Sequence, residues 1–217
     1  MRGDKLVIEP HHRRAAEELA ELLLPRVATA ERPFVVSIGG ESGSGKSELA
    51  RALADAFDRR SLRSVILQQD DYFVHPPKTN DLKRREEIAW VGPGEVRLDR
   101  LDEDLDALRS GADSICKPLV FYNEDRIDEE PLDTTGVRIA IVEGTYTSLL
   151  TNVDVRVFIE RTFRETRDAR ALRAREAQDE FLERVLRIEH ETIATHRSRA
   201  DVAIGPDFSV RKLESET

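Results

Sequence analysis

The 217-residue sequence has one cysteine, Cys116, and no apolar run approaching the roughly 18 residues of a membrane span. A single cysteine excludes an internal disulfide framework and a four-cysteine metal site. The first ten residues carry several charges and lack the apolar segment of a secretory signal, so we expect neither secretion nor membrane spanning. A reducing, cytoplasmic compartment is the expected location.

Positive charge is also scarce, because 34 Lys and Arg residues face 43 Asp and Glu residues, for a net charge of −9. This balance argues against a nucleic-acid partner, since such binding depends largely on basic side chains that neutralise phosphates. The basic residues comprise 28 Arg and only 6 Lys. Arginine suits bidentate phosphate contacts, but biased codon usage explains the ratio equally well. The sequence does not determine the oligomeric state, and a homo-oligomer is compatible with it.

The apolar pattern predicts one α/β domain spanning residues 1–217. Residues 34–38 form a predicted buried strand, a helix with apolar residues between 49 and 57 follows, and a second strand covers residues 65–67. A strand, a helix and a strand within about 35 residues indicate a βαβ unit, and therefore a parallel sheet with right-handed crossovers.

Other segments are assigned around this unit. Residues 1–32 are predicted as an N-terminal helical extension and residues 161–198 as a helical lid with the helices that follow it. Residues 74–136 are predicted as a substrate-side insertion, irregular over 74–97 and with a loop between Pro131 and Gly136. Further strands are expected at residues 137–142, 153–159 and 200–204, and the tail after Asp207 is expected to be loose.

The segment Gly40-Glu41-Ser42-Gly43-Ser44-Gly45-Lys46-Ser47 matches the pattern G-x-x-x-x-G-K-[ST] at every fixed position. A strand precedes it and a helix follows it, which is the context that a phosphate-binding loop requires. The glycines allow the backbone N–H groups to turn inward as an anion nest at the positive end of the helix. Lys46 is predicted to contact the β- and γ-phosphates and the Ser47 hydroxyl to ligate Mg²⁺. We predict an ATP site formed by residues 40–48: Gly40, Glu41, Ser42, Gly43, Ser44, Gly45, Lys46, Ser47 and Glu48.

Two aspartates, Asp70 and Asp71, follow the second strand, at the carboxyl edge where open parallel sheets bind ligands. A carboxylate there can accept a proton from a substrate hydroxyl during phosphoryl transfer, or hold Mg²⁺ through water. The alternative is a helix N-cap or a solvated turn. The next predicted strand ends at Glu143, which places a second carboxylate near the metal.

Arginines recur between residues 161 and 175, at Arg161, Arg164, Arg167, Arg170, Arg173 and Arg175. Steps of three on a helix rotate successive side chains backwards by about 60°, so only two or three can face one bound polyphosphate. The functional interpretation is a lid whose arginines neutralise charge in the transition state. The alternative is a solvated helix with ion pairs at i,i+4 spacing, such as Arg161 with Glu165.

These motifs resemble those of uridine kinase-like proteins in the phosphoribulokinase/uridine kinase family of P-loop kinases. The resemblance rests on residues 38–47 and on Gln69-Asp70-Asp71-Tyr72-Phe73, with looser matches at residues 142–144 and 200–204. It implies a five-stranded parallel sheet of order 2-3-1-4-5, helices on both faces and an arginine-bearing lid.

The resemblance also implies roles for single residues. Asp70 matches the catalytic base, Lys46 and Ser47 the phosphate and magnesium residues, and Glu143 the acid after the third strand. Arg167 and Arg170 are the closest matches to the lid arginines. Tyr72 matches an aromatic residue beside the acceptor, so Asp70, Tyr72 and Glu143 are predicted to line the substrate site.

Two elements depart from the uridine kinase pattern. The Asp-His-Pro element that holds ribose hydroxyls is replaced by Val91-Gly92-Pro93, and the base-binding Tyr and His do not match. Tyr122 and Arg126, shifted in register, are the predicted substrate contacts in their place. The sequence therefore predicts an ATP- and Mg²⁺-dependent kinase of a hydroxyl on a small molecule, with a nucleoside or nucleoside-like acceptor as the first hypothesis. The alternatives are a kinase of another acceptor, such as a sugar phosphate, nicotinamide riboside or pantothenate, and a P-loop ATPase or regulator.

Overall fold

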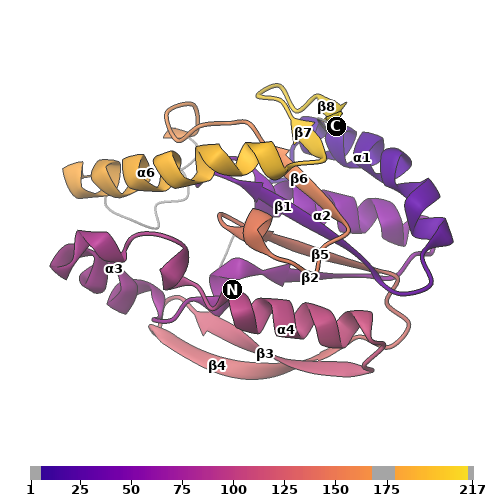
Figure 1. The fold of residues 1–217 in the computed structure, drawn as a ribbon, viewed down its shortest axis with the longest axis horizontal. Coiled ribbons are helices and arrows are strands. Elements are labelled where there is room, and N and C mark those ends of the chain that lie inside the picture. The colour runs from indigo at the N-terminus through magenta and orange to yellow at the C-terminus, as the bar shows by residue number, and fades with distance from the viewer. Residues whose placement is uncertain (1–5, 168–178, 215–217) are drawn as a thin grey trace.

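The computed structural model describes residues 6–167 and 179–214, and a six-stranded sheet lies at its centre (Figure 1). The strand order is β2-β5-β1-β6-β7-β8, and all neighbours pair in parallel except β7 with β8. The five parallel strands have the predicted order 2-3-1-4-5. The strands are β1 (Phe34–Gly40), β2 (Ser64–Gln68), β5 (Ile139–Gly144), β6 (Val155–Ile159), β7 (Val202–Ile204) and β8 (Val210–Lys212).

Alternation along the central strands divides the apolar residues between two cores. In β1, Phe34, Val36 and Ile38 face one core, whereas Val35 faces the other. β5 divides in the same way, with Ile141 on the first side and Val142 on the second. Because both faces of a parallel sheet are covered, its strands are nearly continuous apolar runs, which is why the sequence pattern located them.

Helices cover both faces of the sheet. α1 (Pro10–Thr29) and α2 (Lys46–Asp58) contribute to the first core, and α4 (Leu98–Arg109) and the end of α6 (Glu180–Ile193) contribute to the second (Figure 1). α1 buries four apolar residues at helical spacing: Ala16, Leu19, Leu23 and Val27. In the described parts of the chain, no helix is long and apolar enough to cross a membrane.

Three predictions about irregular segments were wrong. Residues 77–86 of the supposed irregular stretch form the helix α3 (Pro77–Glu86), in which Asn80 alone is buried, so no apolar stripe marks it. The supposed loop around Pro131 is the strand β4 (Arg126–Asp133), paired antiparallel with β3 (Ser114–Phe121). β4 is a largely exposed edge strand, where proline is tolerated.

The tail after Asp207 is also ordered in part, because β8 adds an antiparallel sixth strand to the edge of the sheet. Phe208, which is 2% exposed, anchors this segment in the first core. A single buried aromatic residue in a polar stretch carries no periodicity, so the sequence pattern did not reveal the strand.

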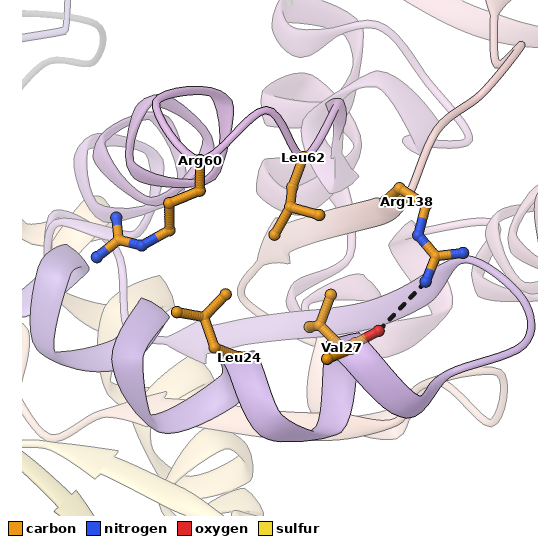
Figure 2. A pocket seen from close by; sticks show the side chains of 6 residues that line it. Leu24, Val27, Arg60, Leu62 and Arg138 are labelled. Carbon is orange, nitrogen blue, oxygen red and sulfur yellow. Dashed lines mark hydrogen bonds between the residues drawn. The ribbon is translucent and has the colours of Figure 1, made fainter.

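A separate hollow opens between the carboxyl-terminal half of α1 and the loop before β2 (Figure 2). Its volume is about 450 Å³. Arg138, directly before β5, donates to the Val27 carbonyl at 3.3 Å along its wall. The hollow lies toward the amino-terminal ends of the strands and contains none of the predicted site residues. Its lining consists of Leu24, Val27, Ala28, Arg60, Leu62 and Arg138.

Candidate active site

The glycine-rich loop joins the carboxyl end of β1 to the first turn of α2. Gly45 precedes the helix at φ +101°, in the left-handed region, and a Cβ there would lie 2.8 Å from the Phe208 ring. Glycine is therefore required for both its backbone freedom and its lack of a side chain. Lys46 is the first helical residue and is 9% exposed, and its Nζ donates to the Glu41 carbonyl at 2.9 Å. The ammonium thus lies across the loop at the positive end of α2. Glu48 is buried in the first helical turn.

Glu41, at a variable position of the motif, attaches the loop to Phe163 and to α6. Its carboxylate accepts from the Phe163 N–H at 2.6 Å and lies 2.7 Å from Nδ1 of His190 on α6. The Thr166 hydroxyl donates to the Ser42 carbonyl at 2.9 Å. The phosphate-binding loop therefore contacts residues 163–166 and α6. No sequence signal predicts these contacts, because variable motif positions carry no residue preference.

The predicted metal residues meet at the adjoining ends of β2 and β5. The Ser47 hydroxyl donates to Oε1 of Glu143 at 3.0 Å, and the Gln68 amide donates to the same oxygen at 3.3 Å. Burial raises the pKa of the Glu143 carboxyl, and the nearby charge of Asp70 raises it further, whereas Lys46 opposes both effects. The negative charges of Asp70 and the buried Glu143 repel each other, and a bound cation would relieve this repulsion.

This arrangement fits Mg²⁺. The ion is usually held by one or two carboxylates together with phosphate oxygens and water, not by an all-protein cage. Accordingly, no group of three or more His, Cys, Asp or Glu side chains in residues 6–167 and 179–214 could hold a metal ion on its own. Ser47 and Glu143 would hold the ion, and Asp70 beside Glu143 could hold it through water or act as the base.

The two consecutive aspartates have different environments. Asp70 is half-buried beside Glu143, whereas Asp71 is 2% exposed and points into the protein. The Asp71 carboxylate accepts from Lys117 Nζ at 3.0 Å and from the Val120 N–H at 2.9 Å. Asp71 therefore fixes β3 of the hairpin to the end of β2, and Asp70 remains the candidate base.

Tyr72 does not lie where the resemblance placed it. Its side chain is fully buried in the second core, and its hydroxyl donates to Asp104 on α4 at 2.8 Å. Burial, with the Asp104 charge, raises the pKa of Tyr72 above its ordinary value. A side chain enclosed in this way cannot contact a substrate, so the prediction for Tyr72 is corrected to a packing role.

Three of the remaining predicted substrate and lid residues, Tyr122, Arg126 and Arg167, lie at the periphery. Tyr122 is half-buried in the hairpin turn, and Arg126 is exposed at the start of β4, paired with Glu124 and Asp128. Arg167 is exposed, and Arg170 lies outside the described residues. The predicted roles of these four residues stay predictions.

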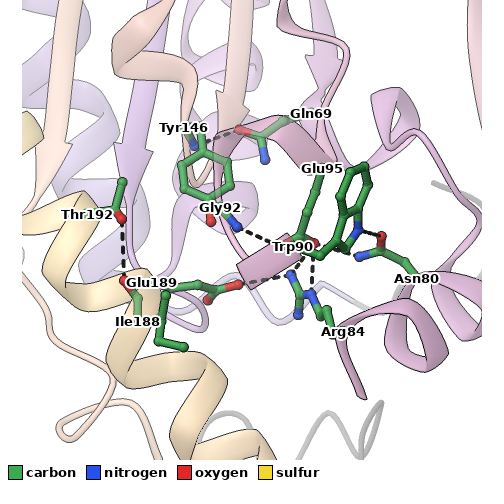
Figure 3. A network of polar contacts seen from close by, with 10 residues as sticks. All are labelled: Gln69, Asn80, Arg84, Trp90, Gly92, Glu95, Tyr146, Ile188, Glu189 and Thr192. Atoms are coloured by element: carbon green, nitrogen blue, oxygen red, sulfur yellow. Dashed lines mark hydrogen bonds and ion pairs between the residues drawn. The ribbon is translucent and has the colours of Figure 1, made fainter. Parts of the chain in front are cut away.

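A buried polar network that sequence reasoning missed joins α3 to α6 (Figure 3). Its centre is Glu95, which is fully buried and accepts from the Asn80 amide at 2.6 Å, Arg84 Nε at 2.8 Å and the Gly92 N–H at 2.8 Å. Arg84 also donates to Glu189 on α6 at 3.1 Å. We call Asn80, Arg84, Glu95 and Glu189 the α3–α6 network. No apolar pattern marks these residues, and only a charge run that includes Arg84 is visible in the sequence.

Comparisons with known proteins agree with this geometry. Residues 35–164 match the model of the Phosphoribulokinase / Uridine kinase family. The bifunctional alpha-galactosidase/sucrose kinase AgaSK of Mediterraneibacter gnavus is 34% identical over 195 residues, which are 83% of this chain and 21% of that protein. A uridine kinase of Ureaplasma urealyticum is 28% identical over 135 residues, 60% of this chain and 64% of that enzyme. The chain thus spans about a fifth of the length of the first relative and just under two thirds of the length of the second.

Among solved structures, a D-glycerate 3-kinase from Cryptococcus neoformans var. grubii superposes with a TM-score of 0.63. The match covers 91% of this chain and 99% of that one at 15% identity, so it supports the fold alone. The family match covers more than half of the chain and includes the phosphate-binding loop, Asp70 and Glu143. This chain therefore belongs to the Phosphoribulokinase / Uridine kinase family.

Proposed function

We propose that this chain is an ATP-dependent, Mg²⁺-requiring kinase that transfers the γ-phosphoryl group to a hydroxyl of a small molecule. The observation that carries the proposal is the meeting of Ser47, Glu143 and Asp70 beside the phosphate-binding loop. A regulator that binds nucleotide does not need a second carboxylate beside the metal residues, whereas transfer to a hydroxyl needs a group that accepts its proton.

Each residue of the candidate site has one role in the proposed phosphoryl transfer. The loop amides and Lys46 hold the phosphates, and Ser47 with Glu143 holds Mg²⁺, which would neutralise charge on the phosphate oxygens. Asp70 orients the acceptor hydroxyl and takes its proton. Arg167 and Arg170 carry positive charge toward the transferring group.

Two acceptor classes are candidates for the same site. The uridine kinase relatives favour a nucleoside, as the sequence predicted. The relative named a sucrose kinase favours a carbohydrate, and it aligns over 83% of this chain compared with 60% for the uridine kinase. Val91-Gly92-Pro93, in place of the Asp-His-Pro element, further weakens the case for a nucleoside.

An acceptor screen tests the proposal. Purified protein with ATP and Mg²⁺ is assayed for ADP release and phosphorylated product with nucleosides, nicotinamide riboside, pantothenate, free sugars, sugar phosphates and glycerate. We expect product with at least one acceptor, and loss of that product without Mg²⁺. Steady ATP hydrolysis with no phosphorylated acceptor would instead support the P-loop ATPase.

A further inference from the structure

Glu41 brings a negative charge into the loop that is predicted to hold the phosphates of ATP. Its side chain is 8% exposed. Its backbone carbonyl accepts from Lys46 Nζ at 2.9 Å and from the Ser44 N–H at 3.2 Å, so the residue is an integral part of the loop. Because charges of like sign repel strongly where water is excluded, a carboxylate here opposes phosphate binding unless other groups hold it in place.

Two donors from distant parts of the chain hold this carboxylate. Oε2 of Glu41 accepts from the Phe163 N–H at 2.6 Å, and Oε1 lies 2.7 Å from Nδ1 of His190. An ionised carboxylate accepts and cannot donate, so Nδ1 carries the proton. The rings of Phe163 and His190 also meet edge to face, with centroids 5.7 Å apart. Within residues 6–167 and 179–214, no lysine or arginine lies at ion-pair distance from the Glu41 carboxylate.

The helix α6 delivers the histidine to the loop. Leu186 and Ile193 are buried, and Ile193 belongs to the second core, so the helix is anchored on both sides of His190. Glu189, the preceding residue, accepts from Arg84 on α3 at 3.1 Å (Figure 3). Consecutive residues of a helix point about 100° apart. One helix therefore contacts the phosphate-binding loop through His190 and α3 through Glu189.

We propose that His190 is a positioning residue for ATP binding: acting through Glu41, it keeps the loop carboxylate turned toward α6 while the loop holds the phosphates. The inference rests on the proposed function, because it assigns a residue that supports the ATP site of that kinase. Without the histidine donor, Oε1 loses its partner and the charge is free to turn toward the phosphates. His190 acts only through Glu41 and is not a catalytic residue.

The test is His190→Leu, which removes the donor and keeps an apolar group beside Phe163. Calorimetry with Mg²⁺ and a non-hydrolysable ATP analogue measures nucleotide binding without turnover. We expect the dissociation constant to rise about 10-fold, the usual effect of losing one hydrogen bond to a charged group. In kinetic assays KM for ATP should rise equally, whereas kcat and KM for the acceptor found in the screen should stay the same.

Two further variants test whether Glu41 is the intermediary. His190→Asn should restore nucleotide binding, because the asparagine amide nitrogen lies at nearly the same place along the side chain as Nδ1 of histidine. Glu41→Gln removes the charge that the histidine holds. In the Glu41→Gln background, the added His190→Leu should cause no further change, since coupled residues have non-additive effects.

The matched control is Glu189→Gln, one residue away on the same helix. It weakens the contact with Arg84 and leaves the loop untouched, so we expect a lower melting temperature with unchanged affinity for the ATP analogue. An equal loss of affinity in Glu189→Gln and His190→Leu would overturn the inference, because it would show a general effect of loosening α6. An equal effect of His190→Leu with and without Glu41→Gln would also overturn it.

The outcomes separate the inference from the proposed function. The expected pattern of nucleotide affinities, without a phosphorylated acceptor in the screen, would support the inference and contradict the kinase. Phosphorylation of an acceptor, with His190→Leu binding the ATP analogue as the wild type does, would overturn the inference alone. Absence of nucleotide binding by the wild type would contradict both.

Discussion

The two consecutive aspartates provide the sharpest test of the site. The same substitution should lower turnover at Asp70 and lower the stability of the fold at Asp71. Asp70→Asn should lower kcat by at least about 100-fold, the usual contribution of a general base. Its free energy of unfolding should change little, since Asp70 is half-buried at the edge of the sheet. Asp71→Asn should instead destabilise the fold, because it removes the charge that Lys117 faces at 3.0 Å with both side chains under 8% exposed.

The size of the Asp71 effect follows from these contacts. Removing one partner of a buried ion pair costs about 3–5 kcal/mol. We expect the lower end, about 3 kcal/mol, because Lys117 keeps Glu130 at 3.0 Å and the asparagine oxygen can still accept from Val120. In a chain of this size that loss lowers the melting temperature by roughly 6–12 °C.

Urea denaturation measures both variants, and a lower midpoint with an unchanged slope reports lost stability. Steady-state kinetics with the acceptor found in the screen measures kcat. The reasoning is refuted if Asp71→Asn is as stable as the wild type, or if Asp70→Asn turns over at the wild-type rate.

Three further predictions concern the phosphate-binding loop, the N-terminal helix and the α3–α6 network. Lys46→Ala should raise KM for ATP and lower kcat, measured by nucleotide titration and kinetics, because it removes the charge on the phosphates; unchanged nucleotide binding would contradict it. Burial and its neighbour His11 lower the pKa of His12 to about 4, so its stabilising effect is present above pH 6.5 and is lost as pH falls toward 4. At pH 5 this loss is about 2 kcal/mol, so His12→Gln should flatten the fall in stability between pH 7 and pH 5. His11→Gln should flatten it less, because burial is the larger cause of the lowered pKa. Arg84→Met should lower the free energy of unfolding by about 3–5 kcal/mol, measured in urea, because it leaves the fully buried Glu95 without its cation.

The parts of the fold that the sequence predicted share one property, a periodic apolar pattern. The parallel strands, α1 and α2 bury apolar residues at regular spacing, and the sequence pattern predicted them. α3 and β4 bury few apolar residues, and they were predicted as irregular chain. Polar contacts hold α3 instead, chiefly through Asn80 and Arg84 to Glu95, and contacts between distant residues leave no periodicity in a sequence.

The candidate site also has a part that the sequence could predict and a part that it could not. The phosphate-binding loop is a contiguous motif whose chemistry follows from its residues, so its glycines, Lys46 and Ser47 could be assigned directly. Asp70 and Asp71 are indistinguishable in the sequence, because both are acids after one strand. Their roles separate only in the structure, where Asp71 meets Lys117 and Asp70 lies beside Glu143.

By itself, the sequence determined a P-loop fold, its strand order through resemblance, and a nucleotide site made from one local stretch of chain. Local motifs and apolar periodicity suffice for these features, because their physical requirements lie within a few consecutive residues. The tertiary structure alone decided that Tyr72 belongs to the core, that Glu41 connects the loop to α6, and that Arg84 joins Glu95 to Glu189. Those features depend on burial and on contacts between residues far apart in the chain, which exist only after the chain has folded.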